Sequence, residues 1–257
     1  MSPAMGVSLK TLPSLEEVKA SNRDRDVPLE AAWIWGENDE LGRLNLLTPE
    51  RILHAKTTEM VDGHCVSLKC GMQAWSEHGI VGRGVLLDYH RWKTEVRKEP
   101  YDAFTSHAIH LEDLEAVASY QNVEFQCGDI LLVRSGYTAT YYEYEKSAPE
   151  RLAEAGTHKP NLAGLAQTEE IKTWLHDRYF SAVAGDAPSF ECWPTTQKWH
   201  LHEYLLACWG VPIGEMFDLE ALAVQCLKRK RWSFFFVSTP LNSPGGVASL
   251  ANAMAIF

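Results

Sequence analysis

The sequence carries no excess of basic residues, and this lack excludes one class of partner. It has 24 lysines and arginines against 34 aspartates and glutamates in 257 residues, so the formal net charge is −10 at pH 7. Proteins that hold nucleic acid neutralise its phosphates with clustered basic side chains. We therefore expect no nucleic-acid partner.

Long apolar runs are missing as well. The longest stretches, residues 234–237 and 247–256, are too short or too interrupted by polar residues to cross about 30 Å of hydrocarbon. The first ten residues lack the basic start and the apolar block that a signal peptide requires. These absences predict a cytoplasmic chain with no membrane partner.

Paired cysteines are the third absence. The six cysteines are scattered without a Cys-x-x-Cys pair, which argues against a structural zinc site and against a redox motif. In a reducing compartment such cysteines are expected to be small buried apolar side chains. The alternative is a nucleophilic cysteine, but none of the six stands in a recognisable Cys/His setting.

What the sequence does contain is enough apolar material for a core, in alternating strand and helix patterns. Hydrophobic residues make up 46% of the chain. Residues 1–29 show no sustained periodicity and are expected to form an N-terminal arm, whereas residues 30–257 predict one α/β domain. The expected strands are 65–69, 85–87, 130–135, 180–184, 211–213, 232–238 and a last one within 247–257; the expected helices are 49–61, 111–119, 149–154, 168–177, 202–208 and 219–228.

The first candidate for chemistry follows the apolar run at residues 85–87. Asp88 and His90 come two residues apart, so an extended chain would place a carboxylate and an imidazole on one face. That pair suits proton transfer. The alternative is structural: Asp88 pairs with Arg83 or Arg91, and His90 is merely exposed.

Two further candidates lie in the second half of the chain. His202 on an expected helix and Glu215 after the next extended segment could converge on one point, and both residue types bind metals; alternatively, His202 is a surface histidine. Asp186, between a glycine and Ala187-Pro188, could serve a site at the end of a strand. Its usual role there is to hold a turn by accepting hydrogen bonds from backbone amides.

Several segments resemble a known family in order and spacing. They are the run from Trp35 to Pro49, then Gly128 to Gly136, Gly185 to Ser189, His202 to Leu206, Gly214-Glu215 and the ending from Pro240 to Ser249. Over about residues 30–257 the chain resembles the cyclase family that includes bacterial kynurenine formamidases and isatin hydrolase. The resemblance implies an α/β fold of the swivelling β/β/α type and assembly as a homodimer or homotetramer.

The resemblance also implies site residues. Family members carry His-x-Gly-Thr-His-x-Asp-x-Pro-x-His, whose first two histidines and aspartate bind zinc or manganese together with a later His and Glu. Asp88, His202 and Glu215 match the last three of these ligands. Gly82 and Leu86 stand where the two leading histidines are expected, and Trp92 replaces the final one. Since neither glycine nor leucine can ligate a cation, no metal is favoured; if one binds, Asp88, His202 and Glu215 would hold it.

These residues predict an enzyme that uses acid–base catalysis without the usual metal. Asp88, His90, His202 and Glu215 are the predicted proton-transfer residues, and Arg83, Tyr89, Trp92, Asp186 and Trp35 are the predicted substrate-binding residues. The expected reaction is cyclisation, dehydration or isomerisation of a small aromatic or polyketide-like molecule of secondary metabolism. The alternatives are a zinc- or manganese-dependent amide or lactam hydrolase resembling kynurenine formamidase, and a non-catalytic binding relative.

Overall fold

The computed structural model describes Glu17, residues 20–21, Arg23, residues 72–243 and residues 246–257. The chain divides between Ser67 and Leu68, and nearly all described residues belong to the second unit. The expected boundary between residues 29 and 30, the expected helix at 49–61, the expected strand at 65–69 and Trp35 lie outside the described residues.

The second unit is built on a six-stranded mixed sheet in the order β6-β5-β3-β1-β7-β8. Four neighbours, β6, β5, β3 and β1, run parallel, and β7 is antiparallel to both β1 and β8. A separate pair of short parallel strands joins β2 to β4. The strands are β1 (Ile80–Leu87), β2 (Ala108–Ile109), β3 (Ile130–Val133), β4 (Gly164–Leu165), β5 (Ala182–Gly185), β6 (Ile213–Gly214), β7 (Ser233–Ser238) and β8 (Met254–Ile256).

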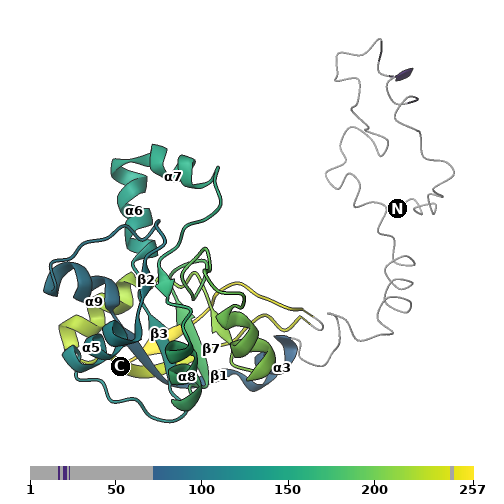
Figure 1. Cartoon of the computed structure of the whole chain (residues 1–257). Helices are drawn as coiled ribbons and strands as arrows, with labels where there is room; N and C mark the ends of the chain where they lie inside the picture. Colours follow the sequence, from purple (N-terminus) through teal and green to yellow (C-terminus); the bar gives the residue numbers. More distant parts are fainter. Residues whose placement is uncertain (1–16, 18–19, 22, 24–71, 244–245) are drawn as a thin grey trace. The chain divides into compact units, whose positions relative to one another are not determined.

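Helices connect these strands (Figure 1). They are α3 (Met72–His78), α4 (Tyr89–Arg91), α5 (Leu111–Tyr120), α6 (Tyr137–Ser147), α7 (Pro149–Ala155), α8 (Glu169–Asp177) and α9 (Glu220–Arg229), with π-helical turns η3 (Trp92–Val96) and η4 (Glu203–Cys208). The α/β fold class expected from the sequence is therefore confirmed. Among the described residues, no helix combines the length and the apolar character that a bilayer crossing requires.

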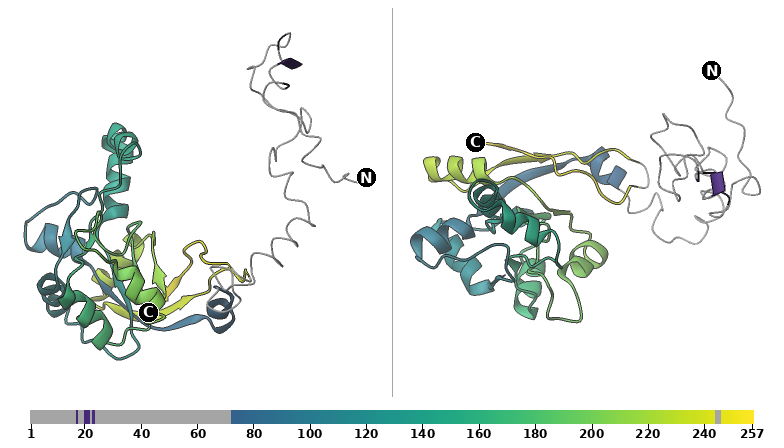
Figure 2. Two further views of the ribbon diagram at one scale, coloured as in Figure 1. Left: turned by 45° about the vertical axis from the view of Figure 1, so that its right-hand side comes forward. Right: turned by 90° about the horizontal axis from the view of Figure 1, so that it is seen from above.

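The core lies on both faces of the sheet because successive strand residues point in opposite directions. Leu87 and Leu131 pack with α5 and α8 on one face, whereas Leu86 and Leu132 pack with α9 on the other. The view from above in Figure 2 shows α9, in yellow-green, on one side of the strands. Covering both faces explains why β1 and β3 read as continuous apolar runs.

The described residues correct some details of the expected secondary structure. The expected last strand within 247–257 is only β8, and the helices α3 and α6 were not expected. Two of the four described cysteines, Cys127 and Cys208, are exposed rather than buried. The tyrosine-rich sequence of α6 lacks a clear apolar stripe, because the helix buries only Thr140 and Tyr144.

Candidate active site

The carboxyl ends of the four parallel strands carry three of the residues selected from the sequence, together with two that were not selected. Asp88 follows β1, Arg134 and Ser135 follow β3, Asp186 follows β5 and Glu215 follows β6. Because parallel strands end at the same edge of a sheet, these side chains are distributed along one rim, where ligands bind in α/β folds. Along this rim they form two separate networks.

The first network joins β1, β3 and α9 through a buried arginine. The Arg134 guanidinium donates to Asp88 Oδ1 at 2.7 Å and to both carboxylate oxygens of Glu220 at 2.7 Å. The Asp88 side chain is 2% exposed and that of Arg134 is 9% exposed. Burial lowers the pKa of the Arg134 guanidinium, but Glu220 and Asp88 together raise it by more, so the net shift is upward. The network ties three elements together, so it suits a structural role for Asp88.

His90 lies beside this network. Its Nδ1 atom is buried and has no hydrogen-bond partner in the described part of the chain. Its ring stands edge-on to that of Tyr101, with the ring centroids 5.7 Å apart. Gly136 makes room for it, because a Cβ atom at that position would overlap the imidazole. Burial lowers the pKa of His90, and the positive charge of Arg134 lowers it further.

Asp186 is fully buried next to the first network and binds the end of β3. Its Oδ1 atom accepts hydrogen bonds from the backbone N of Ser135 at 2.6 Å and from the Ser135 hydroxyl at 2.8 Å. Burial raises the pKa of the Asp186 carboxyl, and the hydrogen bonds from Ser135 oppose that shift. These bonds come from a residue 51 positions earlier in the chain, so Asp186 links the ends of β3 and β5 and does not only hold its own turn.

The second network is a histidine held between two carboxylates. His202 Nδ1 lies 2.7 Å from Glu191 Oε2, and His202 Nε2 lies 3.2 Å from Glu215 Oε1. Glu191 is 1% exposed, whereas the His202 and Glu215 side chains are 35% and 28% exposed. Hydrogen bonds to Glu191 and Glu215 raise the pKa of His202 to about 10. Both contacts favour the protonated form of the imidazole.

The backbone around the second network fixes both carboxylates. Glu215 Oε1 also accepts a hydrogen bond from the backbone N of Phe190 at 2.8 Å. Gly164 packs against the Glu191 backbone so closely that a Cβ atom would lie 2.5 Å from the Glu191 carbonyl carbon. Glu191 was missed in the sequence because its place in the chain follows no motif. The signal that could have found it is a single charge inside the apolar run Phe190-Glu191-Cys192-Trp193.

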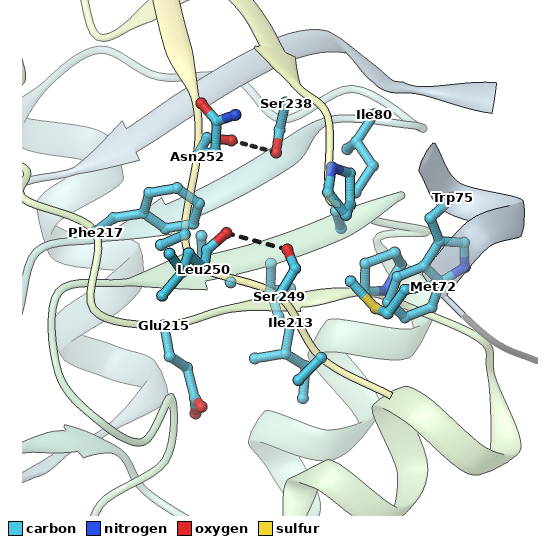
Figure 3. A pocket seen from close by; sticks show the side chains of 18 of the residues that line it. Met72, Trp75, Ile80, Ile213, Glu215, Phe217, Ser238, Ser249, Leu250 and Asn252 are labelled. Carbon is cyan, nitrogen blue, oxygen red and sulfur yellow. Dashed lines mark hydrogen bonds between the residues drawn. The ribbon is translucent and has the colours of Figure 1, made fainter. Parts of the chain in front are cut away.

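His202 lines two cavities. One, of about 450 Å³, is lined by Pro160, Leu162, Pro188, Ser189, Glu191, Trp193, His200, His202 and Glu203. The other, of about 300 Å³, is lined by His202, Glu215 and many apolar residues. Figure 3 shows Glu215 on one side of this cavity. Trp193 and His200 stack with ring centroids 5.3 Å apart in the wall of the first cavity. An imidazolium and a carboxylate thus face space large enough for a small molecule.

The predicted site residues are only partly brought together. His202 and Glu215 contact one another, but no hydrogen bond or ion pair among the described residues links them to Asp88 or His90. The predicted substrate-binding residues have other partners. Arg83 pairs with Asp129 at 2.8 Å, the Tyr89 hydroxyl lies 2.7 Å from His107 Nε2, and Trp92 is 7% exposed. None of these three side chains, nor Asp186, lines the two cavities at His202; their binding roles stay predictions.

Asp88, His202 and Glu215 do not form a metal centre in the described part of the chain. Asp88 is paired with the Arg134 cation, and both ring nitrogens of His202 face carboxylates. The described residues contain no group of three or more His, Cys, Asp and Glu side chains that could hold a metal ion. A cation that needs neutral imidazoles and free carboxylates as ligands does not fit these pairings.

The site and the fold define a class: an α/β protein with a histidine held between two carboxylates at the carboxyl edge of a parallel-rich sheet. Residues 52–192 match the model of the family described as "Putative cyclase". The chain belongs to this cyclase family. No curated protein matches it in sequence.

Solved structures show the same fold. A structure described as a novel cyclase is 29% identical, with a TM-score of 0.60, and the match covers 73% of this chain and 56% of that one. Isatin hydrolase A from Labrenzia aggregata, bound to benzyl benzoate, is 14% identical with a TM-score of 0.51, covering 77% and 69%. Isatin hydrolase A from Ralstonia solanacearum is 15% identical with a TM-score of 0.51, covering 73% and 64%. The chain thus spans just over half the length of the novel cyclase.

Proposed function

We propose that the protein is a cyclase-family enzyme that transfers protons on a small aromatic or polyketide-like molecule, with His202 as acid and Glu215 as base. The observation that carries this proposal is the pair of contacts that hold the His202 imidazole between Glu191 and Glu215, where the histidine lines two cavities. Cyclisation, dehydration and isomerisation of such molecules all need a proton removed from carbon and a proton given to oxygen.

In this proposal the two tasks fall to different residues, and the contacts of each residue support its role. Glu215 Oε1 is occupied by Phe190 N and His202, whereas Oε2 has no hydrogen-bond partner among the described residues and is free to accept a proton from a carbon acid. A substrate carbonyl that approaches His202 Nε2 competes with Glu215 Oε1 for the Nε2 proton. Glu191 stays ion-paired at Nδ1 and stabilises the charged ring. General acid–base catalysis of this kind supplies about 10²–10⁴-fold.

The test is solvent exchange on a panel of aryl 1,3-diketones in D₂O, followed by proton NMR. We expect catalysed exchange or cyclisation, which His202→Gln and Glu215→Gln reduce at least about 10²-fold. His176→Gln is the matched control, because His176 pairs with Asp177 at 2.8 Å on the exposed surface. Equal rates in His176→Gln and His202→Gln would refute the proposal.

A metal-dependent hydrolase is the alternative function, and two further measurements test it. Elemental analysis with and without chelator is combined with assays on isatin and on N-formyl anilides. Stoichiometric zinc or manganese with chelator-sensitive hydrolysis would replace the acid–base proposal. Full cellular function of a Glu215→Gln variant would instead indicate a non-catalytic binding relative.

A further inference from the structure

The cavity that contains Glu215 continues as an apolar groove. It runs over the α9 side of β3, β5 and β6 and is closed by α3 and by the segment 247–252. Figure 3 shows Glu215 on one side and Met72 with Trp75 on the other. The backbone N of Met72 donates to Gly246 O at 2.8 Å, which ties α3 to the closing segment. Apolar side chains dominate the lining, including Met72, Trp75, Ile130, Leu206, Ile213 and Phe217.

Polarity is concentrated at one end of this groove. Away from His202 and Glu215, the polar side chains already bind backbone carbonyls: the Ser238 hydroxyl donates to Asn252 O at 2.5 Å, and the Ser249 hydroxyl donates to Leu250 O at 3.1 Å (Figure 3). A ligand gains few hydrogen bonds there, so what it can gain is burial of apolar surface. The groove is therefore polar at the end with the His202–Glu215 pair and apolar along the rest of its length.

We propose that this groove takes an elongated apolar substituent of the substrate, an alkyl or arylalkyl chain, while the reacting polar end lies at His202 and Glu215. This inference rests on the proposed function, because it assigns the reacting end to those two residues. It narrows the substrate class from a compact aromatic molecule to an amphipathic one whose polar head and apolar tail are several carbons apart.

The size and position of the groove favour a substrate chain as its occupant. Its volume is about 300 Å³, at the small end of the range of ligand pockets. The groove is also continuous with the His202 and Glu215 pair, so a molecule that reacts there places its substituent here.

The experiment measures the affinity of 4-alkylphenols as a function of chain length. Phenol, 4-ethylphenol, 4-butylphenol and 4-hexylphenol are titrated by calorimetry into the full chain. Each methylene buried in the groove should tighten binding by about fourfold, until the chain outgrows the groove. Because the phenol head is the same in all four ligands, the change in affinity per methylene measures the binding of the alkyl chain in the groove.

Matched variants locate the binding. Ala251 is an exposed residue that lines the groove, so Ala251→Trp should fill it and flatten the slope. Val224→Trp on α9 is the control, because Val224 is 59% exposed and does not line the groove. His202→Gln should weaken all four phenols by a similar factor and leave the slope unchanged.

Two results would overturn the inference: an affinity independent of chain length, or the same slope in Ala251→Trp and Val224→Trp. Thermal unfolding checks that Ala251→Trp is folded, and Ser249→Trp, on the same segment, provides a second groove-filling variant. Failure of the proposed function would give a different result from failure of this inference. It would abolish the difference between His202→Gln and His176→Gln in exchange rates while leaving the chain-length slope intact.

Discussion

Single residues set the protonation of the site. Glu191 is almost fully buried and accepts from His202 Nδ1, so it favours the charged imidazole in the folded state. His202 and Glu215 could be selected from the sequence through the family resemblance. Glu191 could not be selected in this way. Its role depends on its contact with His202, 11 positions further along the chain, and no pattern in the sequence indicates that contact.

The pH dependence of stability follows from His202. Its pKa in the folded chain, about 10, lies above its ordinary value of 6.5. A raised pKa means that the folded state binds the proton more tightly, so this stabilisation is complete below pH 6.5 and is lost as the pH rises towards 10. Denaturant unfolding at pH 6, 8 and 10 should therefore show a larger decline for the wild type than for His202→Gln. Equal declines in the unfolding free energy of the wild type and of His202→Gln would contradict the claim that His202 is an imidazolium in the folded chain.

A second residue-scale prediction concerns Glu191 itself. Glu191→Gln keeps the shape but removes the charge beside His202 Nδ1. A hydrogen bond between charged groups contributes about 1.5–3 kcal/mol, so we expect a comparable loss of unfolding free energy together with a His202 pKa closer to 6.5. Glu203→Gln is the control, because Glu203 also lines the cavity but its carboxylate accepts a hydrogen bond, among the described residues, only from the backbone N of His200.

At the scale of elements, strand ends decide where the chemistry lies. The apolar runs of β1, β3 and β5 predicted buried strands, and the strands place Asp88, Arg134 and Asp186 along one rim. Hydropathy could not reveal how the rim divides into two networks. The division depends on Arg134, which pairs with Asp88 and with Glu220, 86 positions further along the chain.

The Arg134 network predicts a stability effect for Asp88. Asp88→Asn removes one of the two carboxylates of a buried guanidinium, which should destabilise the fold by about 1.5–3 kcal/mol. Arg91→Gln breaks the exposed Arg91–Glu95 pair and should cost less than about 1 kcal/mol. Urea unfolding compares the two. A stable but inactive Asp88→Asn would instead support the sequence prediction that Asp88 transfers protons.

At the scale of the molecule, the family resemblance predicts a homodimer or a homotetramer. One part of the sheet, at β1, β7 and β8, carries the exposed apolar residues Val81, Phe235, Met254 and Ile256, at 46–62% exposure. Side chains of this kind on adjacent strands are typical of surfaces that associate. Light scattering on the full chain should give the mass of two or four copies, and the mass of one copy would contradict the prediction.

The claim on which the account depends is that Glu191 and Glu215 hold His202 as an imidazolium at the mouth of the groove. Nitrogen-15 NMR of histidine-labelled protein tests it directly, with His202→Gln used to assign the resonance. The account predicts that both ring nitrogens of His202 stay protonated at pH 8 and lose a proton near pH 10. A His202 resonance that titrates near pH 6.5 would contradict it.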